Sequence, residues 1–380
     1  MRPIRIGIAG LGVAGLAFVP PAMASSAFEL AAVADPDPNV CDALAAQHNA
    51  TSYADFETML MHPGLDAIVI ATPTVLHKQH ALAAFDAGLH VVLEKPMATD
   101  LADAALIVSA AERAGRVLLV GHSHSFDLPI QRMRELITGG TLGRVRMIHN
   151  WCYSDWIYRP RRPDELDAAT GGGVTLRQGA HQFDIIRLLA GGGLRSVRAQ
   201  VFDWDPARKV IGAHSVFLEF HDGTVGTAVY NGYGGLASSE LTAGITEWGF
   251  SEGPTLPSTR VAPADVAQAK RRRANASDKS QAPFQPHFGL TVVSCERGDI
   301  RQSPDGLIVY SAAGRQEIKL PSGQTPHALL LVEFAGAVQG ERPCLHDGHW
   351  GLANLECCLA ALTSSETGKT VTLQHQITLP

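Results

Sequence analysis

A glycine-rich segment near the amino terminus has the residue types and the spacing that bind the diphosphate of a dinucleotide. Gly10-Leu11-Gly12-Val13-Ala14-Gly15 has the order GxGxxG and follows Ile4–Ala9, an apolar run typical of a buried strand. Gly10 allows a tight turn, Gly12 lets the backbone approach a diphosphate, and Gly15 permits close packing of the next helix on the strand. The chain has 37 glycines, so this pattern needs support from its context.

A carboxylate further along the chain supplies that support. Asp35 ends the next predicted strand, 20 residues after Gly15, where a carboxylate accepts hydrogen bonds from an adenosine ribose. It would repel a phosphate on that ribose, and Pro36-Asp37-Pro38 offers no basic residue to hold one. The sequence therefore favours NAD over NADP as cofactor.

Two further residues have the chemistry to move a proton. Lys95 lies in Glu94-Lys95-Pro96, and His181 follows the glycine run Gly171-Gly172-Gly173 by eight residues. Oxidation of a CH–OH group sends a hydride to the nicotinamide and leaves a hydroxyl proton for a base. A lysine can be that base when partial burial and a cationic ring lower its pKa. Taken singly, Lys95 would be a surface lysine, and His181 would make a local hydrogen bond at a helix start.

Strand-like and helix-like segments alternate regularly over the first third of the chain. Strands separated by helices of this length indicate βαβ units and a parallel, doubly wound sheet. We therefore predict an α/β fold with a dinucleotide-binding Rossmann domain over residues 1–122. Its predicted strands are Ile4–Ala9, Glu29–Ala34, Ala67–Ala71, His90–Leu93 and Val117–Val120, and its predicted helices are Asn39–His48, His77–Ala87 and Leu101–Ala114.

The pattern changes after about Phe126. Short alternating runs between Val197 and Tyr230, separated by His221-Asp222-Gly223, and a second hairpin over Leu307–Leu320 indicate antiparallel strands. We predict that residues 123–380 form an α+β domain for substrate binding and oligomerisation, built on a mostly antiparallel open sheet. Its other predicted elements are a strand over Val145–Tyr153 and helices over Leu128–Thr138, Gln182–Leu189, Pro326–Val338 and Trp350–Ser364.

Charge and cysteine usage exclude several classes of protein. The net charge of -6 and the pI of about 6.2 give no general attraction to nucleic acid or acidic membranes. The dense basic run Lys270-Arg271-Arg272-Arg273 is either a solvated loop or a lid or subunit contact near an anionic ligand. Six cysteines without a CxxC pair suit a reducing compartment, so we expect a cytoplasmic protein. His77 and His80, or His122 and His124, lack carboxylates at metal-site spacing, and no metal is expected.

The amino terminus allows a second interpretation. Arg2 and Arg5 precede an apolar run, Ile6–Val19, and Ala22-Met23-Ala24 imitates a signal-peptidase site. However, Pro20-Pro21 breaks the run, and cleavage there would remove the first predicted strand. We therefore expect no secretory signal. No uninterrupted apolar stretch of about 18 residues follows, so no membrane-spanning helix is expected either.

Together these motifs resemble those of one oxidoreductase family. The glycine segment, Ala71-Thr72-Pro73, Glu94-Lys95-Pro96 and Gln178-Gly179-Ala180-His181-Gln182-Phe183-Asp184 occur in the order and spacing of the glucose–fructose oxidoreductase/inositol dehydrogenase (Gfo/Idh/MocA) family, over essentially the whole chain. The resemblance implies an NAD-dependent dehydrogenase that forms homodimers or homotetramers, with Lys95 as acid/base at the reacting carbinol and His181 beside it. The cofactor site it implies comprises Gly10, Gly12, Val13, Ala14, Gly15, Asp35, Thr72, Pro73, His77, Glu94 and Lys95.

One position departs from the family pattern. Members commonly have an aspartate four residues before the histidine, where this chain has Arg177 in Arg177-Gln178-Gly179-Ala180-His181. A fixed cation disfavours a neutral polyol and favours a substrate with a carboxylate, which a guanidinium binds in a bidentate fork. The change also argues against an acid–base relay that needs the aspartate.

An aromatic and basic segment lies upstream of Arg177. Its side chains have the chemistry to bind a planar ring and its acidic substituents, and His124 is placed near them by motif context. The alternative is that the aromatic residues pack in a sheet and that the arginines lie in a solvated loop. The residues of this segment are Trp151, Tyr153, Trp156, Tyr158, Arg159, Arg161 and Arg162, of which Trp156, Tyr158, Arg159 and Arg161 are the predicted substrate contacts.

The same segments resemble one branch of the family, the phthalate cis-4,5-dihydrodiol dehydrogenases. Asp155-Trp156-Ile157-Tyr158-Arg159-Pro160-Arg161, the stretch from Arg177 to Asp184, and His287-Phe288-Gly289-Leu290-Thr291 carry the resemblance. It implies oxidation of a carboxylated cyclic cis-dihydrodiol to a catechol, a reaction of phthalate degradation and aromatic catabolism. The alternatives are a dehydrogenase of a sugar, polyol or sugar acid, and a non-catalytic NAD-binding ligand sensor.

Overall fold

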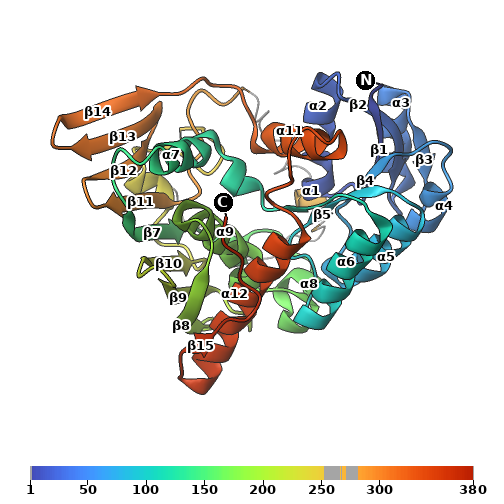
Figure 1. Cartoon of the computed structure of the whole chain (residues 1–380). Coiled ribbons are helices and arrows are strands. Elements are labelled where there is room, and N and C mark those ends of the chain that lie inside the picture. Colours follow the sequence, from blue (N-terminus) through green and yellow to red (C-terminus); the bar gives the residue numbers. More distant parts are fainter. Residues whose placement is uncertain (1, 252–265, 267, 271–280, 380) are drawn as a thin grey trace. The chain divides into compact units, whose positions relative to one another are not determined.

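The computed structural model describes residues 2–251, 266, 268–270 and 281–379. Contacts between residues divide the chain into two units, whose elements are labelled in Figure 1. The first unit comprises the described residues up to His122 together with His327–Leu355. The second comprises the described residues of Ser123–Pro326 and of the chain from Glu356 onward. Arg271-Arg272-Arg273, part of the basic run, lies outside the described residues.

The first unit is built on a parallel sheet, which confirms the predicted Rossmann architecture. Over residues 2–122 the six strands have the order β3-β2-β1-β4-β5-β6, and all their pairings are parallel. The apolar strand β4 is buried along its whole length, as a strand inside such a sheet must be. The strands are β1 Ile4–Ala9, β2 Phe28–Ala34, β3 Thr51–Tyr53, β4 Ala67–Ile70, β5 His90–Glu94 and β6 Leu118–Gly121.

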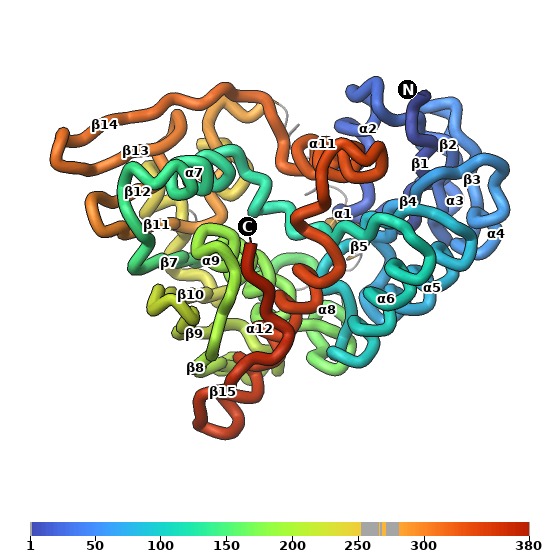
Figure 2. The backbone as a smooth tube through the Cα atoms, viewed as in Figure 1, coloured from blue at the N-terminus to red at the C-terminus, as the bar shows by residue number. Residues whose placement is uncertain are grey.

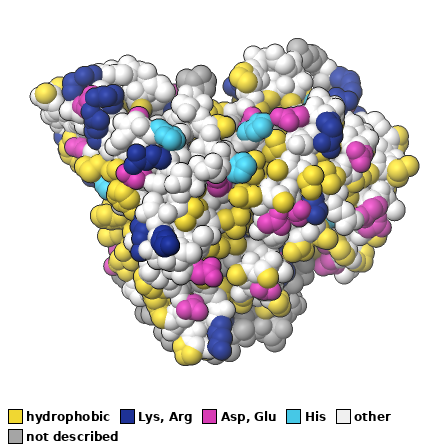
Figure 3. All heavy atoms as spheres, turned by 60° about the horizontal axis from the view of Figure 1, so that its bottom comes forward, with side chains coloured by type: hydrophobic (Ala, Val, Ile, Leu, Met, Phe, Trp, Pro, Cys, Tyr) yellow, Lys and Arg dark blue, Asp and Glu magenta, His cyan; other side chains and the backbone are white. Residues whose placement is uncertain are grey.

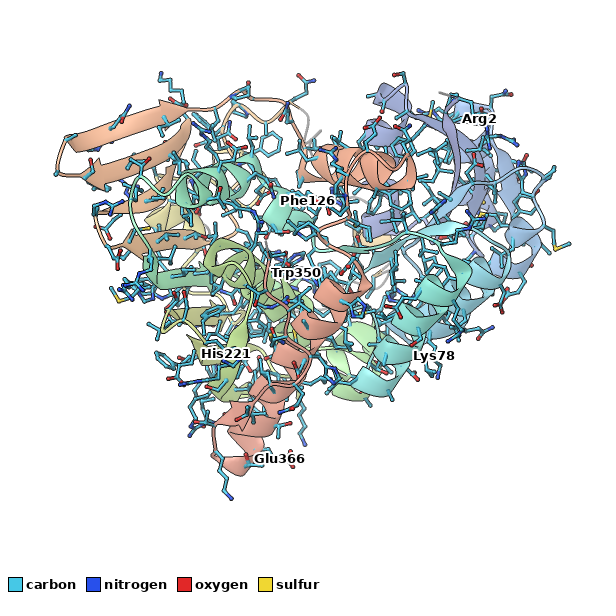
Figure 4. The ribbon with its side chains drawn as sticks, in the orientation of Figure 1. Arg2, Lys78, Phe126, His221, Trp350 and Glu366 are labelled. Carbon is cyan, nitrogen blue, oxygen red and sulfur yellow. The ribbon has the colours of Figure 1, made fainter. Side chains whose placement is uncertain are left out.

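Local sequence explains where the helices of this unit begin and end. The Asp100 side chain accepts a hydrogen bond from Asp103 N (2.9 Å) at the start of α6, and Gly115 ends that helix with a φ of 59°. Lys78 of α5 pairs with Asp103 of α6 (2.7 Å), and Figure 4 labels this lysine. The helices are α1 Val13–Leu16, α2 Val19–Ala24, α3 Pro38–His48, α4 Phe56–Leu60, η1 Thr74–Leu76, α5 His77–Asp86, α6 Leu101–Ala114 and α11 Pro326–Val338.

The chain returns to the first unit at His327 and leaves it again after Leu355, before the last strand of the second unit's sheet (Figure 2). The ring of His327, near the start of α11, makes an edge contact with Phe18 at 4.8 Å, and Val120 N donates to His346 O at 2.9 Å. The domain boundaries predicted from the sequence assign residues 327–355 to the second domain, because the order of elements along the chain does not indicate that the chain returns to the first. The boundary after His122 is the same in both divisions.

The second unit contains a larger, mostly antiparallel sheet. Its described strands have the order β14-β13-β12-β11-β7-β10-β9-β8-β15, and only β7 and β10 pair in parallel. This confirms the predicted α+β class of the second domain. The strands are β7 Val145–Tyr153, β8 Leu194–Phe202, β9 Ala213–Phe220, β10 Val225–Asn231, β11 Leu290–Cys295, β12 Gly298–Ser303, β13 Gly306–Ser311, β14 Gly314–Lys319 and β15 Val371–Thr372.

Helix α9 is the central helix of this unit and is buried through Leu189. Its Gln182 side chain donates to Asn150 Oδ1 (2.6 Å) on β7 and to Val229 O (3.0 Å) on β10, which fixes the helix on the sheet. The helices are η2 Ser123–Phe126, α7 Leu128–Thr138, η3 Trp156–Tyr158, α8 Pro163–Leu166, η4 Ala168–Thr170, η5 Thr175–Gly179, α9 Ala180–Ala190, η6 Ser238–Leu241 and α12 Gly348–Thr367, which begins in the first unit.

Surface charge is mixed in sign. On the face drawn in Figure 3, basic and acidic side chains are interspersed, in keeping with the small net charge of -6. Among the described residues, no helix is both long and apolar enough to cross a membrane. The part of the chain that the structure describes also holds no group of three or more His, Cys, Asp or Glu side chains arranged for a metal ion.

Candidate active site

The glycine segment has the geometry that a diphosphate requires. Gly10 follows β1 with a φ of +84°, and a Cβ there would lie 2.6 Å from Ala71 O. A Cβ on Gly15 would overlap Gly10 O, whereas a Cβ on Gly12 would meet open space. Because Gly10 and Gly15 have no side chain, the backbone segments next to them can approach closely. Gly12 leaves room for a ligand beside the start of α1, where Val13 and Ala14 follow.

Asp35 is held firmly beside this segment. Its carboxylate accepts hydrogen bonds from Leu11 N (2.7 Å) and Asp37 N (2.9 Å), both backbone amides. The first of these bonds ties the end of β2 to the glycine segment. The Asp35 carboxylate is therefore fixed beside the glycine segment, where its negative charge would repel a phosphate on the adenosine ribose.

His77 connects two loops of the first unit. Its ring is buried, with Nε2 2.9 Å from Thr72 O and Nδ1 2.9 Å from Pro96 O. The Thr72 loop, which continues into Pro73, is thereby tied to the turn that carries Lys95. The sequence predicts His77 as a cofactor contact, and the structure also gives it this positioning role.

Lys95 lies at the end of the sheet. It follows Glu94, the last residue of β5, whose carboxylate accepts a hydrogen bond from Lys95 N at 3.2 Å. The Lys95–Pro96 peptide bond is cis. Strand β5 thus delivers Lys95 at its carboxyl end, the edge at which parallel α/β sheets bind ligands.

In the second unit, Arg177 and His181 lie on consecutive turns. Arg177 is in the π-helical turn η5, and His181 is in the first turn of α9. π-Helical turns are rare in proteins as a whole, and those that occur are often found at functional sites. Arg177 Nε donates to Gly171 O (3.2 Å), and its Nη2 lies 3.8 Å from Asp164 Oδ2.

His181 belongs to a cluster of rings that we call the ring cluster: His124, His181, Trp248 and Phe288. The ring of His124 stacks on Phe288 (4.3 Å between centroids) and makes an edge contact with His181 (4.7 Å). Trp248 lies 5.1 Å from His124. The structure therefore brings together His124 and His181, which the sequence predicts in different roles.

The predicted substrate arginines form ion pairs within the second unit. Arg159 Nε donates to Asp155 Oδ1 (2.7 Å), and its Nη1 lies 3.7 Å from Glu247 Oε1. Burial alone would lower the pKa of Arg159, but Glu247 and Asp155 outweigh it and raise that pKa. Glu247 also accepts a hydrogen bond from Trp248 Nε1 (2.8 Å), which links these pairs to the ring cluster.

Glu165 is the centre of a second group of ion pairs. Its side chain is 6% exposed, with Lys270 Nζ 2.5 Å from Oε2 and Arg161 Nη1 3.4 Å from Oε1. Burial would raise the pKa of Glu165, but Lys270 and Arg161 outweigh it and hold that pKa at about 2. Lys270, the described residue of the basic run, is therefore anchored rather than solvated. Arg162 and Arg177 share Asp164 nearby.

The aromatic side chains of this segment are interior. Trp156 is fully buried, and the guanidinium of Arg161 lies 4.0 Å above its ring. Burial lowers the pKa of Arg161 to about 10. The hydroxyl of the buried Tyr158 donates to Asp205 (2.7 Å). Both rings are thus buried, but in the turn η3 and not in a sheet, and the guanidinium of Arg161 packs on one of them.

Sequence reasoning missed Asp127, Glu165 and Glu247. Asp127 precedes a predicted helix, so its position indicates an ordinary helix cap. Glu165 and Glu247 have no motif around them. Only the excess of arginines between 159 and 177 indicates that buried carboxylates must lie nearby, because buried guanidinium groups need partners.

The chain matches two models of one protein family. Residues 4–122 match the model described as oxidoreductase family, NAD-binding Rossmann fold, and residues 130–235 match the Gfo/Idh/MocA C-terminal domain. The protein therefore belongs to the Gfo/Idh/MocA family, as its motifs predict. It is an oxidoreductase, and NAD is its cofactor.

Individual relatives narrow the comparison. The chain is 34% identical over 377 residues to 1-carboxy-3-chloro-3,4-dihydroxycyclohexa-1,5-diene dehydrogenase from Comamonas testosteroni, covering 94% of each protein. A solved structure from Bordetella bronchiseptica RB50 is 34% identical, with a TM-score of 0.92 over 98% of this chain and 100% of that one. An oxidoreductase from Agrobacterium radiobacter, in complex with NAD+, L-tartaric acid and magnesium, shares the fold at 18% identity (TM-score 0.74, 97% and 98% covered).

Proposed function

We propose that this protein oxidises a carboxylated cyclic cis-dihydrodiol, of the phthalate 4,5-dihydrodiol type, to a catechol with reduction of NAD. The observation that carries the proposal is the group of arginines around Arg177 in the second unit. Among the described residues, five basic side chains form ion pairs with four carboxylates there, and such a group of basic side chains suits a ligand that carries a carboxylate. The Comamonas relative supports the same class, because its name describes a carboxylated cyclohexadiene with two neighbouring hydroxyl groups. The basic residues are Arg159, Arg161, Arg162, Arg177 and Lys270, and the acidic ones Asp155, Asp164, Glu165 and Glu247.

The reaction requires positioning and a place for one proton. The glycine segment with Asp35 would hold NAD, which would supply the acceptor for the hydride of the carbinol carbon. In the proposed reaction Lys95 takes the proton of the same carbon's hydroxyl, and His181 orients this hydroxyl or relays its proton. The resulting ketone aromatises to the catechol, which drives the reaction forward.

The direct test is the appearance of NADH with purified protein, NAD and a set of candidate substrates. Phthalate cis-4,5-dihydrodiol is compared with myo-inositol, glucose and glucuronate. We expect fast turnover of the dihydrodiol only. Turnover of glucuronate alone would agree with the cofactor and with an anionic substrate, but it would reject the proposal that the product is a catechol. Turnover of glucose or inositol would also reject the proposal that the substrate carries a carboxylate.

Replacing Arg177 with alanine should raise KM for the dihydrodiol about 10- to 100-fold, because charged hydrogen bonds contribute about 1.5–3 kcal/mol. We expect a smaller change in kcat, since the guanidinium would bind substrate and transition state alike. Arg132→Ala is a matched control, because Arg132 pairs with Glu135 on an exposed part of α7. Steady-state kinetics decide the matter, and an unchanged KM in Arg177→Ala would reject the carboxylate contact.

We also propose that the open sheet of the second unit pairs with a second copy of the chain. Met147 and Trp151 on β7 and Phe217 on β9 are 42–44% exposed. His149 lies between Met147 and Trp151 on β7, and both His149 and Phe217 pair with Thr227 of β10, so these residues are neighbours in the sheet. Trp151→Asp should therefore halve the mass measured by light scattering, because a buried charge opposes such an interface. Met61→Asp, at an 83% exposed position of the first unit, serves as control. A monomeric wild type would contradict the proposal.

A further inference from the structure

Asp127 occupies the position of a helix cap without capping the helix. It precedes α7, where an aspartate normally accepts a hydrogen bond from an N–H of the first turn. Its side chain makes no such bond. Oδ2 lies 3.0 Å from Nδ1 of His124 instead, and Oδ1 makes no hydrogen bond within the described part of the chain. Giving up a cap costs about 1 kcal/mol, so the carboxylate is placed for His124.

The pair is removed from water, which determines how it holds protons. The side chains of His124 and Asp127 are 4% and 0% exposed. Burial raises the pKa of Asp127, Glu247 adds to the rise, and His124 opposes it. A carboxylate in this position is stabilised when Nδ1–H of the imidazole faces it, and more so when Nε2 takes a proton and the ring becomes a cation. Asp127 therefore favours the tautomer of His124 with its proton on Nδ1, which leaves Nε2 as the proton acceptor of the ring.

The surroundings of the pair suit a flat substrate. Phe288, His181 and Trp248 contact the ring of His124, and aromatic faces pack well against a planar ring. The segment η2, which contains His124 and ends at the labelled Phe126 (Figure 4), packs against α7 and α9. The titratable groups on these elements and beside Trp248 are Arg132, Arg134 and Glu135 on α7, His181, Asp184 and Arg187 on α9, and Glu247.

Most of these groups have other partners. Arg132 and Glu135 form an exposed pair, Arg134 donates to Leu188 O (3.4 Å), and Arg187 donates to Gln376 Oε1 (3.1 Å). Two of these groups act on the pair directly. His181 contacts the ring of His124, and the charge of Glu247 raises the pKa of Asp127.

We propose that Asp127 is a positioning residue that makes His124 the base for a second proton transfer, an inference that rests on the proposed function. After hydride transfer, the ketone lies next to a carbinol carbon that still carries a hydrogen. Nε2 of His124 takes this hydrogen as a proton, and the ammonium of Lys95 returns the hydroxyl proton to the ketone oxygen. The C–H electron pair becomes part of the aromatic ring, so the product is the catechol and no further oxidant is needed. His124 then releases its proton to water.

The experiment has two measurements on the full-length protein. Nitrogen NMR of the histidine rings gives the tautomer of His124 in the wild type, which we expect to carry its proton on Nδ1. Single-turnover kinetics with NAD and the dihydrodiol then follow NADH and catechol separately in wild type and Asp127→Asn. We expect catechol formation to slow about 10²-fold in the variant while NADH formation stays within a few-fold.

Glu333→Gln provides the matched control. Glu333 Oε1 lies 3.1 Å from Nδ1 of His346 in another carboxylate–imidazole pair, located in the first unit, whose side chains are 17% and 1% exposed. This variant should lose stability but form NADH and catechol together. The inference is overturned if catechol keeps pace with NADH in Asp127→Asn, or if wild-type His124 carries its proton on Nε2. A wild type that does not oxidise the dihydrodiol rejects the proposed function itself, and so is distinguishable from both results.

Discussion

Replacing Lys95 with methionine should lower kcat for the substrate about 10²- to 10⁴-fold, the usual contribution of a positioned acid/base. Methionine keeps most of the side-chain length but cannot accept the hydroxyl proton. Lys95 is also a predicted cofactor contact, but the glycine segment and Asp35 are unchanged in this variant, so NADH should still bind, which nucleotide fluorescence would show. The two results together would separate a lost proton acceptor from a lost cofactor site.

Lys78→Met is the matched control for this experiment. Lys78 is also a lysine of the first unit, but it forms a partly exposed pair with Asp103 between two helices. Such pairs contribute about 0–1 kcal/mol, so this variant should keep kcat and lose little stability. A Lys95→Met protein with wild-type turnover would reject the assignment of the acid/base. Ligand binding by both proteins without any turnover would instead favour the non-catalytic sensor.

The sequence predicts several elements of both units well, because local patterns specify them. β1, α6, α7, β7 and α11 have the predicted bounds, since apolar periodicity, caps and glycines mark each of them. The short edge strand β3 was not predicted. It reads Thr-Ser-Tyr, without apolar alternation, and pairs only with β2.

The chemistry of the second unit is less accessible to sequence reasoning, because its partners are chosen by tertiary packing. Lys270 and Glu165 are 105 residues apart, and nothing in either neighbourhood indicates the pairing. Asp127 carries the sequence pattern of a helix cap, yet its carboxylate turns to His124. The sequence thus predicts which residue types gather, here arginines and histidines, but not which carboxylates hold them in place.

Replacing Glu165 with glutamine should destabilise the protein by about 3–5 kcal/mol, the usual effect of removing one partner from a buried ion pair. Arg161 and Lys270 would keep their charges while losing the carboxylate between them. Glu296→Gln is the control, because Glu296 also joins two basic residues, Arg144 and Arg146, but in an exposed position. Urea unfolding at neutral pH should show a clearly smaller loss for that variant. Equal losses would mean that burial of Glu165 does not matter.

The pH dependence of the same variant tests the cause of the effect. The pKa of Glu165 is about 2 in the folded protein, below the ordinary glutamate value of about 4.3 in the unfolded chain. The folded state therefore holds the ionised form more strongly, and this contributes about 3 kcal/mol above pH ~4.3. As the pH falls from ~4.3 towards 2, the unfolded chain takes up the proton first and the contribution is lost. The difference in unfolding free energy between wild type and Glu165→Gln should consequently shrink between pH 7 and pH 3, whereas a difference that stays constant would assign the loss to packing rather than to charge.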